Sequence, residues 1–493
     1  MDRSSSSISV SSPQKILWNT IFSTFSEFSL FFTFLFFILV ARFLGDTAFG
    51  QFSSALAFVG IFTLLVIFGF SYSITKWIVR DRSNSGAYTG AALVVQIGLT
   101  LLCFGITYGT ALLFHHKYPH EVRMLILLVY VAECLKCYTL TLRSAVKALG
   151  GFHLDTLAMN AERVVLVVLG GILLLLGKGL YTAAGILVFS RVISFVVLYW
   201  AVHRLSPDGI SFPGMDVCIQ LVRESWIYMV QSLFWRIYDY IDVVLLSLLS
   251  TFEATGWYGA GRRILEGLWI IPNILTEALY PELNARHLVS LQLVKNVLDK
   301  AVKYLMMIGF GVCIGVLVLS KSLVQWFYGS AFQHTAHVLL ILGLTIVPSY
   351  LRYVFGNTLI AINLQKKEIE ISAGRSIFNI LANVILISRY GFLGAAVATV
   401  LTDFFALGLY LRLLYKVHLA GKAWVKDFGK SFASFLCVIP LFWGIRGISA
   451  PVQCLVLLGT YLVFLWIFRA LTIHEMVFFY SHVAGKWREF IHR

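Results

Sequence analysis

Apolar stretches of about twenty residues recur along almost the whole chain, separated by short polar segments. An α-helix needs about 20 mostly apolar residues to cross the hydrocarbon core of a bilayer. Only 13% of the 493 residues are charged, which is about half the share found in soluble domains. A soluble enzyme with one membrane anchor is therefore excluded. An outer-membrane barrel is excluded as well, because its strands alternate polar and apolar residues.

The pattern predicts an all-α integral membrane protein with fourteen transmembrane helices. We expect two parallel-repeat six-helix lobes around a central cavity that opens alternately to each side, followed by two C-terminal helices. The predicted spans are residues 16–41, 50–75, 87–114, 121–143, 154–177, 180–202, 222–249, 255–281, 301–327, 334–362, 369–388, 392–415, 429–447 and 451–470.

Two short motifs recur at matching distances and indicate an internal duplication. Gly50-Gln51-Phe52 is followed 206 residues later by Gly256-Trp257-Tyr258, and Ala183 corresponds to Ala395, 212 residues later. Both offsets equal six spans, so the two units enter the membrane from the same side, as in transporters with parallel repeats. The predicted divisions are an N-terminal tail (1–15), an N-terminal lobe (16–203), a linker (204–221), a C-terminal lobe (222–416), helices 13 and 14 (417–470), and an interfacial tail (471–493).

Basic residues are distributed unevenly between the two sides of the membrane. In this topology 25 of the 39 Lys and Arg residues, Arg375 among them, lie on the side of the termini, seven lie on the other side, and seven lie within spans. Cytoplasmic loops carry the excess of Lys and Arg, so we expect both termini in the cytoplasm and the protein in the inner (plasma) membrane. The net charge of +15 then requires no nucleic acid. The Ser-rich start shows no cleavable signal peptide, and the seven cysteines imply no disulfide framework.

Ionisable residues within spans face a cavity or a partner by default. Arg236, Asp239 and Asp242 share one face of the seventh predicted span. Arginine suits a phosphate because its planar fork donates two parallel hydrogen bonds. For each cation the alternative is pairing with a neighbour such as Glu133, Glu162 or Glu266, or snorkelling to the surface. The other candidate cations for an anionic head group are Arg262, Arg263, Arg352, Arg163, Lys136 and Arg191.

Five acids within the spans are candidates for proton or sodium coupling, with counter-charge for the arginines as the alternative. They are Glu27, Asp239, Asp242, Glu277 and Asp403.

No pattern typical of an enzyme is present, and we expect no catalytic residue, cofactor or metal. A Gly-rich phosphate loop with lysine is missing, so ATP is not the direct driver. The histidines of one outer loop, His115, His116 and His120, have no carboxylate at metal-ligand spacing beyond Glu121.

Several loose motifs, in this order and spacing, resemble the polysaccharide-export branch of the multidrug/oligosaccharidyl-lipid/polysaccharide flippase superfamily. The resemblance covers most of the chain. The matching residues are Ala41-Arg42-Phe43-Leu44-Gly45 with Phe49-Gly50, Arg236 to Asp242, Gly256-Trp257-Tyr258 through Pro272 to Ala278-Leu279-Tyr280-Pro281, Tyr328-Gly329 with Phe332, and Asn379 to Asn383 through Tyr390-Gly391 to Gly394-Ala395-Ala396.

Membership in this family implies alternating-access flipping of a polyprenyl-diphosphate-linked oligosaccharide to the outer leaflet. It also implies substrate contact by cations of the first, seventh and eighth spans, namely Arg42, Arg236, Arg262 and Arg263. The expected partners are this anionic glycan lipid, membrane lipids, a coupling H⁺ or Na⁺, and glycan polymerase or ligase proteins. The alternatives are a cation-coupled multidrug antiporter of the same superfamily and a membrane-embedded glycan polymerase or glycosyltransferase, which the short outer loops disfavour.

Overall fold

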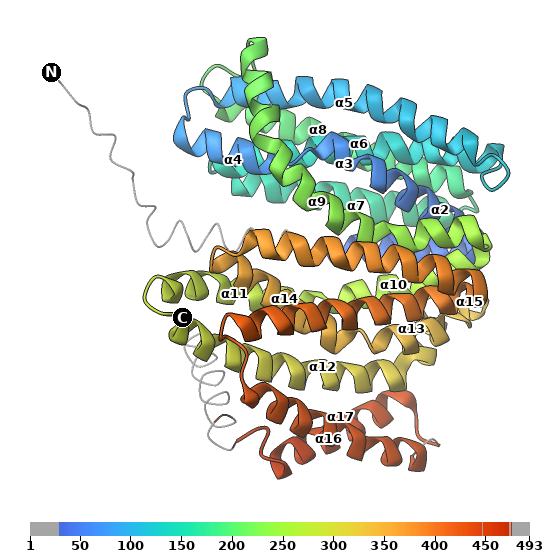
Figure 1. The fold of residues 1–493 in the computed structure, drawn as a ribbon. Coiled ribbons are helices and arrows are strands. Elements are labelled where there is room, and N and C mark those ends of the chain that lie inside the picture. Colours follow the sequence, from blue (N-terminus) through green and yellow to red (C-terminus); the bar gives the residue numbers. More distant parts are fainter. Residues whose placement is uncertain (1–28, 446, 473–474, 476–493) are drawn as a thin grey trace, which may run out of the picture. The chain divides into compact units, whose positions relative to one another are not determined.

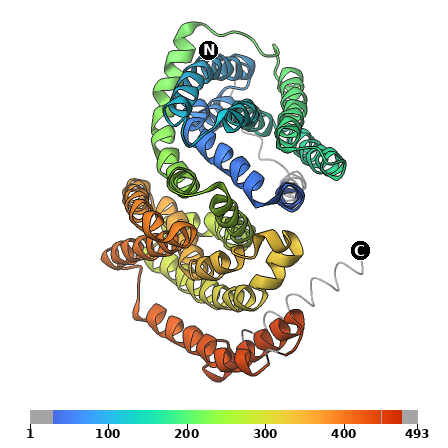
Figure 2. The ribbon, with the colours of Figure 1, turned by 90° about the vertical axis from the view of Figure 1, so that its right-hand side faces the viewer.

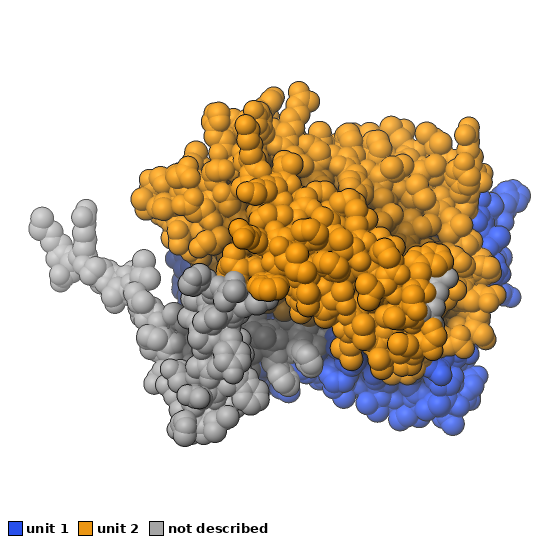
Figure 3. Space-filling model, turned by 90° about the horizontal axis from the view of Figure 1, so that it is seen from below, with its two compact units in different colours: residues 1–256 blue, residues 257–493 orange. Residues whose placement is uncertain are grey.

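The computed structural model describes residues 29–445, 447–472 and 475, and the regular structure of these residues is entirely helical. The chain divides into two compact units, residues 1–256 and 257–493, which are coloured separately in Figure 3. Of the described helices, eight are long and apolar enough to cross a membrane. The count is nine if α13 and α14, which meet at an angle of 51°, form one broken span. The protein is therefore an all-α, multi-span membrane protein.

The first unit is organised around α6 (Figure 1). This helix packs against α2, α4, α5, α7 and α8, and 61% of its apolar window is buried, whereas the other helices of the unit have lipid-facing sides. Its helices are α2 (Leu30–Phe62), α3 (Leu64–Ile67), α4 (Phe70–Arg80), α5 (Ser85–Leu113), α6 (His120–Ala148), α7 (Phe152–Leu175), α8 (Leu180–Leu205), α9 (Met215–Leu249) and the start of α10 (Phe252–Leu268).

The second unit packs α14 and α15 together, with α12 on α13, α14, α16 and α17. The C-terminal pair, α16 and α17, lies side by side along α12 in both ribbon views (Figures 1 and 2). Besides the rest of α10, the helices are α11 (Ile270–His287), α12 (Leu291–Phe327), η1 (Ser330–Phe332), α13 (Thr335–Gly343), α14 (Ile346–Ala361), α15 (Gln365–Lys416), α16 (Lys422–Gly444) and α17 (Ala450–Ile467).

Two glycines with positive φ divide α2 and α15 at the places where the sequence predicts a turn between spans. Gly45 in α2 has φ 84°, and Gly391 in α15 has φ 56°. A side chain at either position would be strained, so each glycine permits a sharp corner without a loop. The described part of each predicted span is therefore largely helical, and for the first span this part begins at residue 30.

Three predicted spans are broken where the sequence indicates one continuous helix. The second span is interrupted at Phe68 and Gly69, which have φ of 46° and 75°. The eighth span divides at Trp269 into α10 and α11, and the tenth divides between α13 and α14. Breaks of this kind occur in transporters where backbone lines a cavity or is buried in protein.

The connection from α8 to α9 runs along α5. A methyl group at Gly86 would lie 1.7 Å from the Gly209 carbonyl oxygen, and one at Gly90 would lie 2.0 Å from that of Ser211. These close approaches hold the start of α9 in the first unit. The lobe and linker boundaries themselves stay a prediction.

Candidate functional site

Glu133 is the centre of a buried charge cluster in the first unit. It lies on α6 and is 3% exposed. Its carboxylate oxygens lie 3.1 Å from Lys136 Nζ and 3.6 Å from a terminal nitrogen of Arg191 on α8. Arg191 Nε also lies 3.0 Å from Glu162 Oε1 on α7. Three helices are therefore joined by one ionic network. Pairing with Glu133 or Glu162 is the alternative to substrate contact that the sequence left open for these cations.

Arg236 brings α9 to the same cluster. It interacts electrostatically with Glu133, and its guanidinium carbon lies 5.7 Å from the centroid of the Tyr240 ring. That ring packs against α2 at Gly60, where a methyl group would come within 2.7 Å of it. Asp239 interacts with Arg236 as well, so the cluster sets Lys136, Arg191 and Arg236 against Glu133, Glu162 and Asp239.

The remaining predicted residues of the first unit have different environments. Asp242 is fully buried and Asp239 is half-buried. Arg163 is buried and donates a hydrogen bond to Ser29 Oγ at the start of α2. Arg42 is exposed, three residues before Gly45, and Glu27 lies outside the described residues.

In the second unit, Arg262 and Arg263 share one carboxylate. Arg262 Nε lies 3.1 Å from Glu266 Oε1, and a terminal nitrogen of Arg263 lies 3.0 Å from Glu266 Oε2. The three- and four-residue spacings on α10 bring these side chains together. Two cations therefore share one acid on α10.

A second buried network in this unit surrounds Asp403, a predicted coupling acid. Its Oδ1 lies 2.7 Å from a terminal nitrogen of Arg375, and its Oδ2 accepts a 2.9 Å hydrogen bond from Ser349 of α14. Arg375 is buried, so it belongs with the cations within spans and not with the loop cations counted on the side of the termini. Its position six residues inside a predicted span was the signal for burial.

Glu368 was not singled out by the sequence either, because it precedes the predicted start of its span. It is buried and accepts hydrogen bonds from Ser372 Oγ (2.9 Å) and the Tyr410 hydroxyl (3.1 Å). Arg352, a predicted cation, is also buried, with its guanidinium carbon 5.0 Å from the centroid of the Tyr353 ring. Glu277 is exposed and accepts a 3.3 Å hydrogen bond from Asn273.

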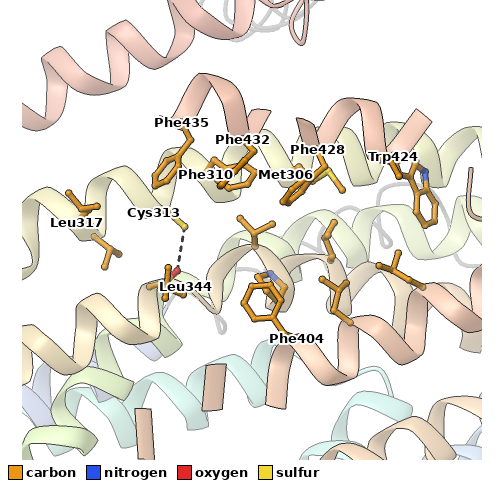
Figure 4. A pocket seen from close by; sticks show the side chains of 18 of the residues that line it. Met306, Phe310, Cys313, Leu317, Leu344, Phe404, Trp424, Phe428, Phe432 and Phe435 are labelled. Atoms are coloured by element: carbon orange, nitrogen blue, oxygen red, sulfur yellow. Dashed lines mark hydrogen bonds between the residues drawn. The ribbon is translucent and has the colours of Figure 1, made fainter. Parts of the chain in front are cut away.

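An apolar pocket of about 430 Å³ lies between α12, α14, α15 and α16 of the second unit (Figure 4). Phe310 and the α16 residues Phe428, Phe432 and Phe435 form one wall, and Leu344 and Phe404 lie opposite them. The lining carries almost no polar surface, so the pocket accommodates hydrocarbon.

The histidine and cysteine motifs form no metal centre in the described part of the chain. His115 and His116 lie with ring centroids 3.7 Å apart, while Cys134 and Cys137 are buried free thiols. No three His, Cys, Asp or Glu side chains among the described residues are grouped to hold a metal ion.

Apolar helices, broken spans and networks of charged side chains within the spans are typical of a multi-span membrane transporter. The sequence pattern of the polysaccharide biosynthesis protein family matches residues 16–285, more than half of the chain, and that of the lipid II flippase MurJ matches residues 223–462. The chain belongs to the polysaccharide biosynthesis protein family, in the polysaccharide-export flippase branch of its superfamily. It is a transporter and not an enzyme.

Individual relatives agree with this assignment. A protein of Haloferax volcanii described as a flippase of low-salt glycan biosynthesis is 24% identical over 76% of this chain and 78% of its own length. A protein of Shigella flexneri described as an O-antigen transporter is 22% identical over 73% of this chain and 88% of its own.

Solved structures share the fold. The lipid II flippase MurJ in an inward closed conformation superimposes with a TM-score of 0.71 at 16% identity, covering 91% of this chain and 98% of its own. An inward-facing multidrug resistance transporter of the MATE family gives a TM-score of 0.65 at 16% identity, covering 79% and 94%.

Proposed function

We propose that this protein flips a polyprenyl-diphosphate-linked oligosaccharide across the plasma membrane during polysaccharide biosynthesis. The observation that carries the proposal is the gathering of charged groups within the spans, where Lys136, Arg191 and Arg236 lie with three carboxylates in the first unit. In the second unit, Arg262 and Arg263 share the carboxylate of Glu266. Buried charge in a membrane protein marks a substrate or ion pathway.

A diphosphate fits these clusters chemically. Guanidinium groups donate paired hydrogen bonds to phosphate oxygens, and attraction between charges is stronger in a low-dielectric interior than in water. Because the carboxylates already hold the cations in place, an arriving diphosphate meets preorganised donors. The ion pairs also screen the cations, so binding is reversible, as transport requires.

The apolar pocket of the second unit suits the lipid portion of such a substrate. Its wall of phenylalanines along α16 (Figure 4) offers a continuous hydrocarbon surface. A polyprenyl chain packed there buries apolar area at about 25 cal/mol per Å². The chain remains in an apolar environment while the head group crosses.

The transport cycle proposed here is alternating access, with both termini cytoplasmic. Ligand and a coupling proton or sodium ion shift the balance between inward-open and outward-open states through their different affinities for each. Asp242, fully buried on the helix that carries Arg236, is our candidate for the coupling acid.

Reconstitution in vesicles with a fluorescent lipid-linked glycan tests the function directly. Flipping should occur with wild-type protein and fall at least tenfold in Arg236→Ala and Arg262→Ala, while the exposed Arg389→Ala retains the wild-type rate. Proton and sodium gradients, applied separately, identify the coupling ion. Flipping at the wild-type rate in both Arg236→Ala and Arg262→Ala would refute the diphosphate site.

The shared fold with MATE transporters makes cation-coupled drug export the second candidate. Cationic drugs favour sites dominated by acids, whereas the clusters here contain arginines and a lysine that suit an anion. Drug efflux by vesicles that flip no glycan lipid would establish this alternative.

A further inference from the structure

Tyr72 of α4 and Tyr228 of α9 form a stacked pair in the first unit. Their ring centroids are 5.1 Å apart, with an interplanar angle of 25°. Tyr72 is 63% exposed, so one ring face and its edge remain open. Neither hydroxyl makes a hydrogen bond to another described residue.

The break in the second span creates this arrangement. Phe68 and Gly69 both adopt positive φ, and a methyl group at Gly69 would lie 2.5 Å from the Tyr228 Cβ. Only glycine permits α9 to approach this closely. Beside the rings, the buried hydroxyl of Ser225 donates a 2.7 Å hydrogen bond to Ser73 Oγ and fixes α9 against α4.

Polar groups flank the tyrosine pair on the same side. Glu224 Oε2 lies 3.1 Å from Lys76 Nζ and accepts a 3.1 Å hydrogen bond from Trp77 Nε1. Gln220 donates a 3.4 Å hydrogen bond to the other carboxylate oxygen. Both Lys76 and Glu224 are partly exposed.

The exposed side of α4 is therefore unsuited to lipid. Apart from Val79, its exposed residues carry polar groups, namely Tyr72, Thr75, Lys76 and Arg80, while the opposite side is buried among apolar neighbours. Lys76 and Arg80 follow the predicted span end at residue 75, where charged side chains face water or a partner and not hydrocarbon.

From this geometry we infer that Tyr72, Tyr228, Lys76, Glu224 and Gln220 form a subsite for sugar residues of the transported glycan. A sugar presents an apolar C–H face together with a ring of hydroxyls. Aromatic rings pack against the former, while carboxylate, amide, ammonium and phenol groups exchange hydrogen bonds with the latter. Ligand sites combine such apolar surfaces with a few placed polar groups.

The position along α9 agrees with a glycan whose diphosphate lies at Arg236. Tyr228 precedes Arg236 by eight residues, which is about 12 Å along a helix. That distance suits a short oligosaccharide extending from the diphosphate toward the N-terminal end of α9. The subsite rests on the proposed function, because it assigns the sugar portion of the same substrate.

Binding of two lipids to full-length protein in nanodiscs tests the inference. One probe is polyprenyl-diphosphate-linked oligosaccharide from the source membranes, and the other is polyprenyl diphosphate without sugar. Wild-type protein should bind the glycan lipid at least tenfold more tightly. Tyr72→Ala and Tyr228→Ala should lose this preference while binding the bare lipid normally, and Arg236→Ala should weaken both.

Two further variants separate recognition from folding. Tyr72→Phe retains the ring and should keep most of the preference, while Tyr415→Ala removes a tyrosine that is 74% exposed elsewhere and should change nothing. If the Tyr228→Ala protein does not fold, the Tyr72→Ala result alone tests the subsite, because the Tyr72 ring is exposed and its removal should not unfold the protein. Equal weakening of both lipids, or an intact preference, in Tyr72→Ala overturns the subsite. Binding of neither lipid by wild-type protein refutes the proposed function and the subsite with it.

Discussion

Gly50 of α2 packs against the backbone of α10, and Gly256 of α10 packs against the backbone of α2. A methyl group at Gly50 would lie 1.8 Å from the Phe252 carbonyl oxygen, and one at Gly256 would lie 2.2 Å from that of Asp46. Both glycines and both carbonyls are related by the repeat offset of 206 residues, as are Thr47 and Glu253, whose side chains form a 3.0 Å hydrogen bond. The contact is therefore reciprocal.

Replacing Gly50 with valine should destabilise the protein by about 2–3 kcal/mol, the upper range for overpacking. A backbone carbonyl cannot move aside as a flexible side chain can. The apparent Tm in detergent measures the effect. Gly98→Val on α5, where a Cβ meets nothing within 4 Å, is the matched control. A Tm for Gly50→Val as high as that of the control would show that the helices separate at little cost.

Glu133→Gln should lower the free energy of unfolding by about 1–3 kcal/mol, because Lys136 and Arg191 lose the carboxylate that they share within the first unit. Thermal unfolding with and without added polyprenyl diphosphate measures this loss and its recovery. The lipid should stabilise the variant more than the wild type, since it replaces the missing negative charge. Equal stabilisation of both proteins would place the diphosphate elsewhere. Glu370→Gln, whose ion pair with Lys367 is exposed, serves as the control.

Arg375 and Asp403 test whether a predicted coupling acid acts as counter-charge. Arg375→Gln alone leaves Asp403 buried and charged, and should cost about 3–5 kcal/mol of stability. Arg375→Gln combined with Asp403→Asn should recover much of that loss, and a counter-charge role requires that flipping recover as well. A stable double variant that no longer responds to an ion gradient would instead identify Asp403 as the coupling site.

The turn between α4 and α5 should loosen in acid. Hydrogen bonds from Ser83, Asn84 and Tyr88 lower the pKa of the exposed Asp81 from 3.8 to about 2. Because the folded-state pKa is depressed, this stabilisation is complete above about pH 4 and is lost as the pH falls toward 2. Hydrogen exchange of residues 81–88, corrected for the intrinsic rate, measures it. Asp81→Asn should remove the pH dependence, and a persistent dependence would assign it to another group.

The sequence predicted more of the helices than of their breaks. Runs of apolar residues located each described span, since length and apolarity alone decide whether a helix crosses a bilayer. The corners at Gly45 and Gly391 were also foreseeable, because glycine adopts positive φ without strain. The break at Phe68 was not, because a phenylalanine takes positive φ only when surrounding structure holds it there.

The candidate site was predicted in part. Arg236, Arg262 and Lys136 were identified because a charge within an apolar run stands out in any sequence. Glu368 was missed because its burial depends on contacts such as that with Tyr410, 42 residues away, and not on local composition, whereas Arg375, six residues inside a predicted span, could have been identified. Residues that sit near a predicted span end look like surface residues until their neighbours are known.

The sequence by itself determined that the chain crosses a membrane many times, carries a duplication, and places cations in apolar surroundings. These properties follow from composition and spacing, which act locally along the chain. Only the tertiary structure decided which carboxylate each cation faces, and that Tyr72 and Tyr228 meet beside Glu224. Those contacts join helices distant in sequence, and their geometry is set by how side chains and glycine gaps on different helices fit together.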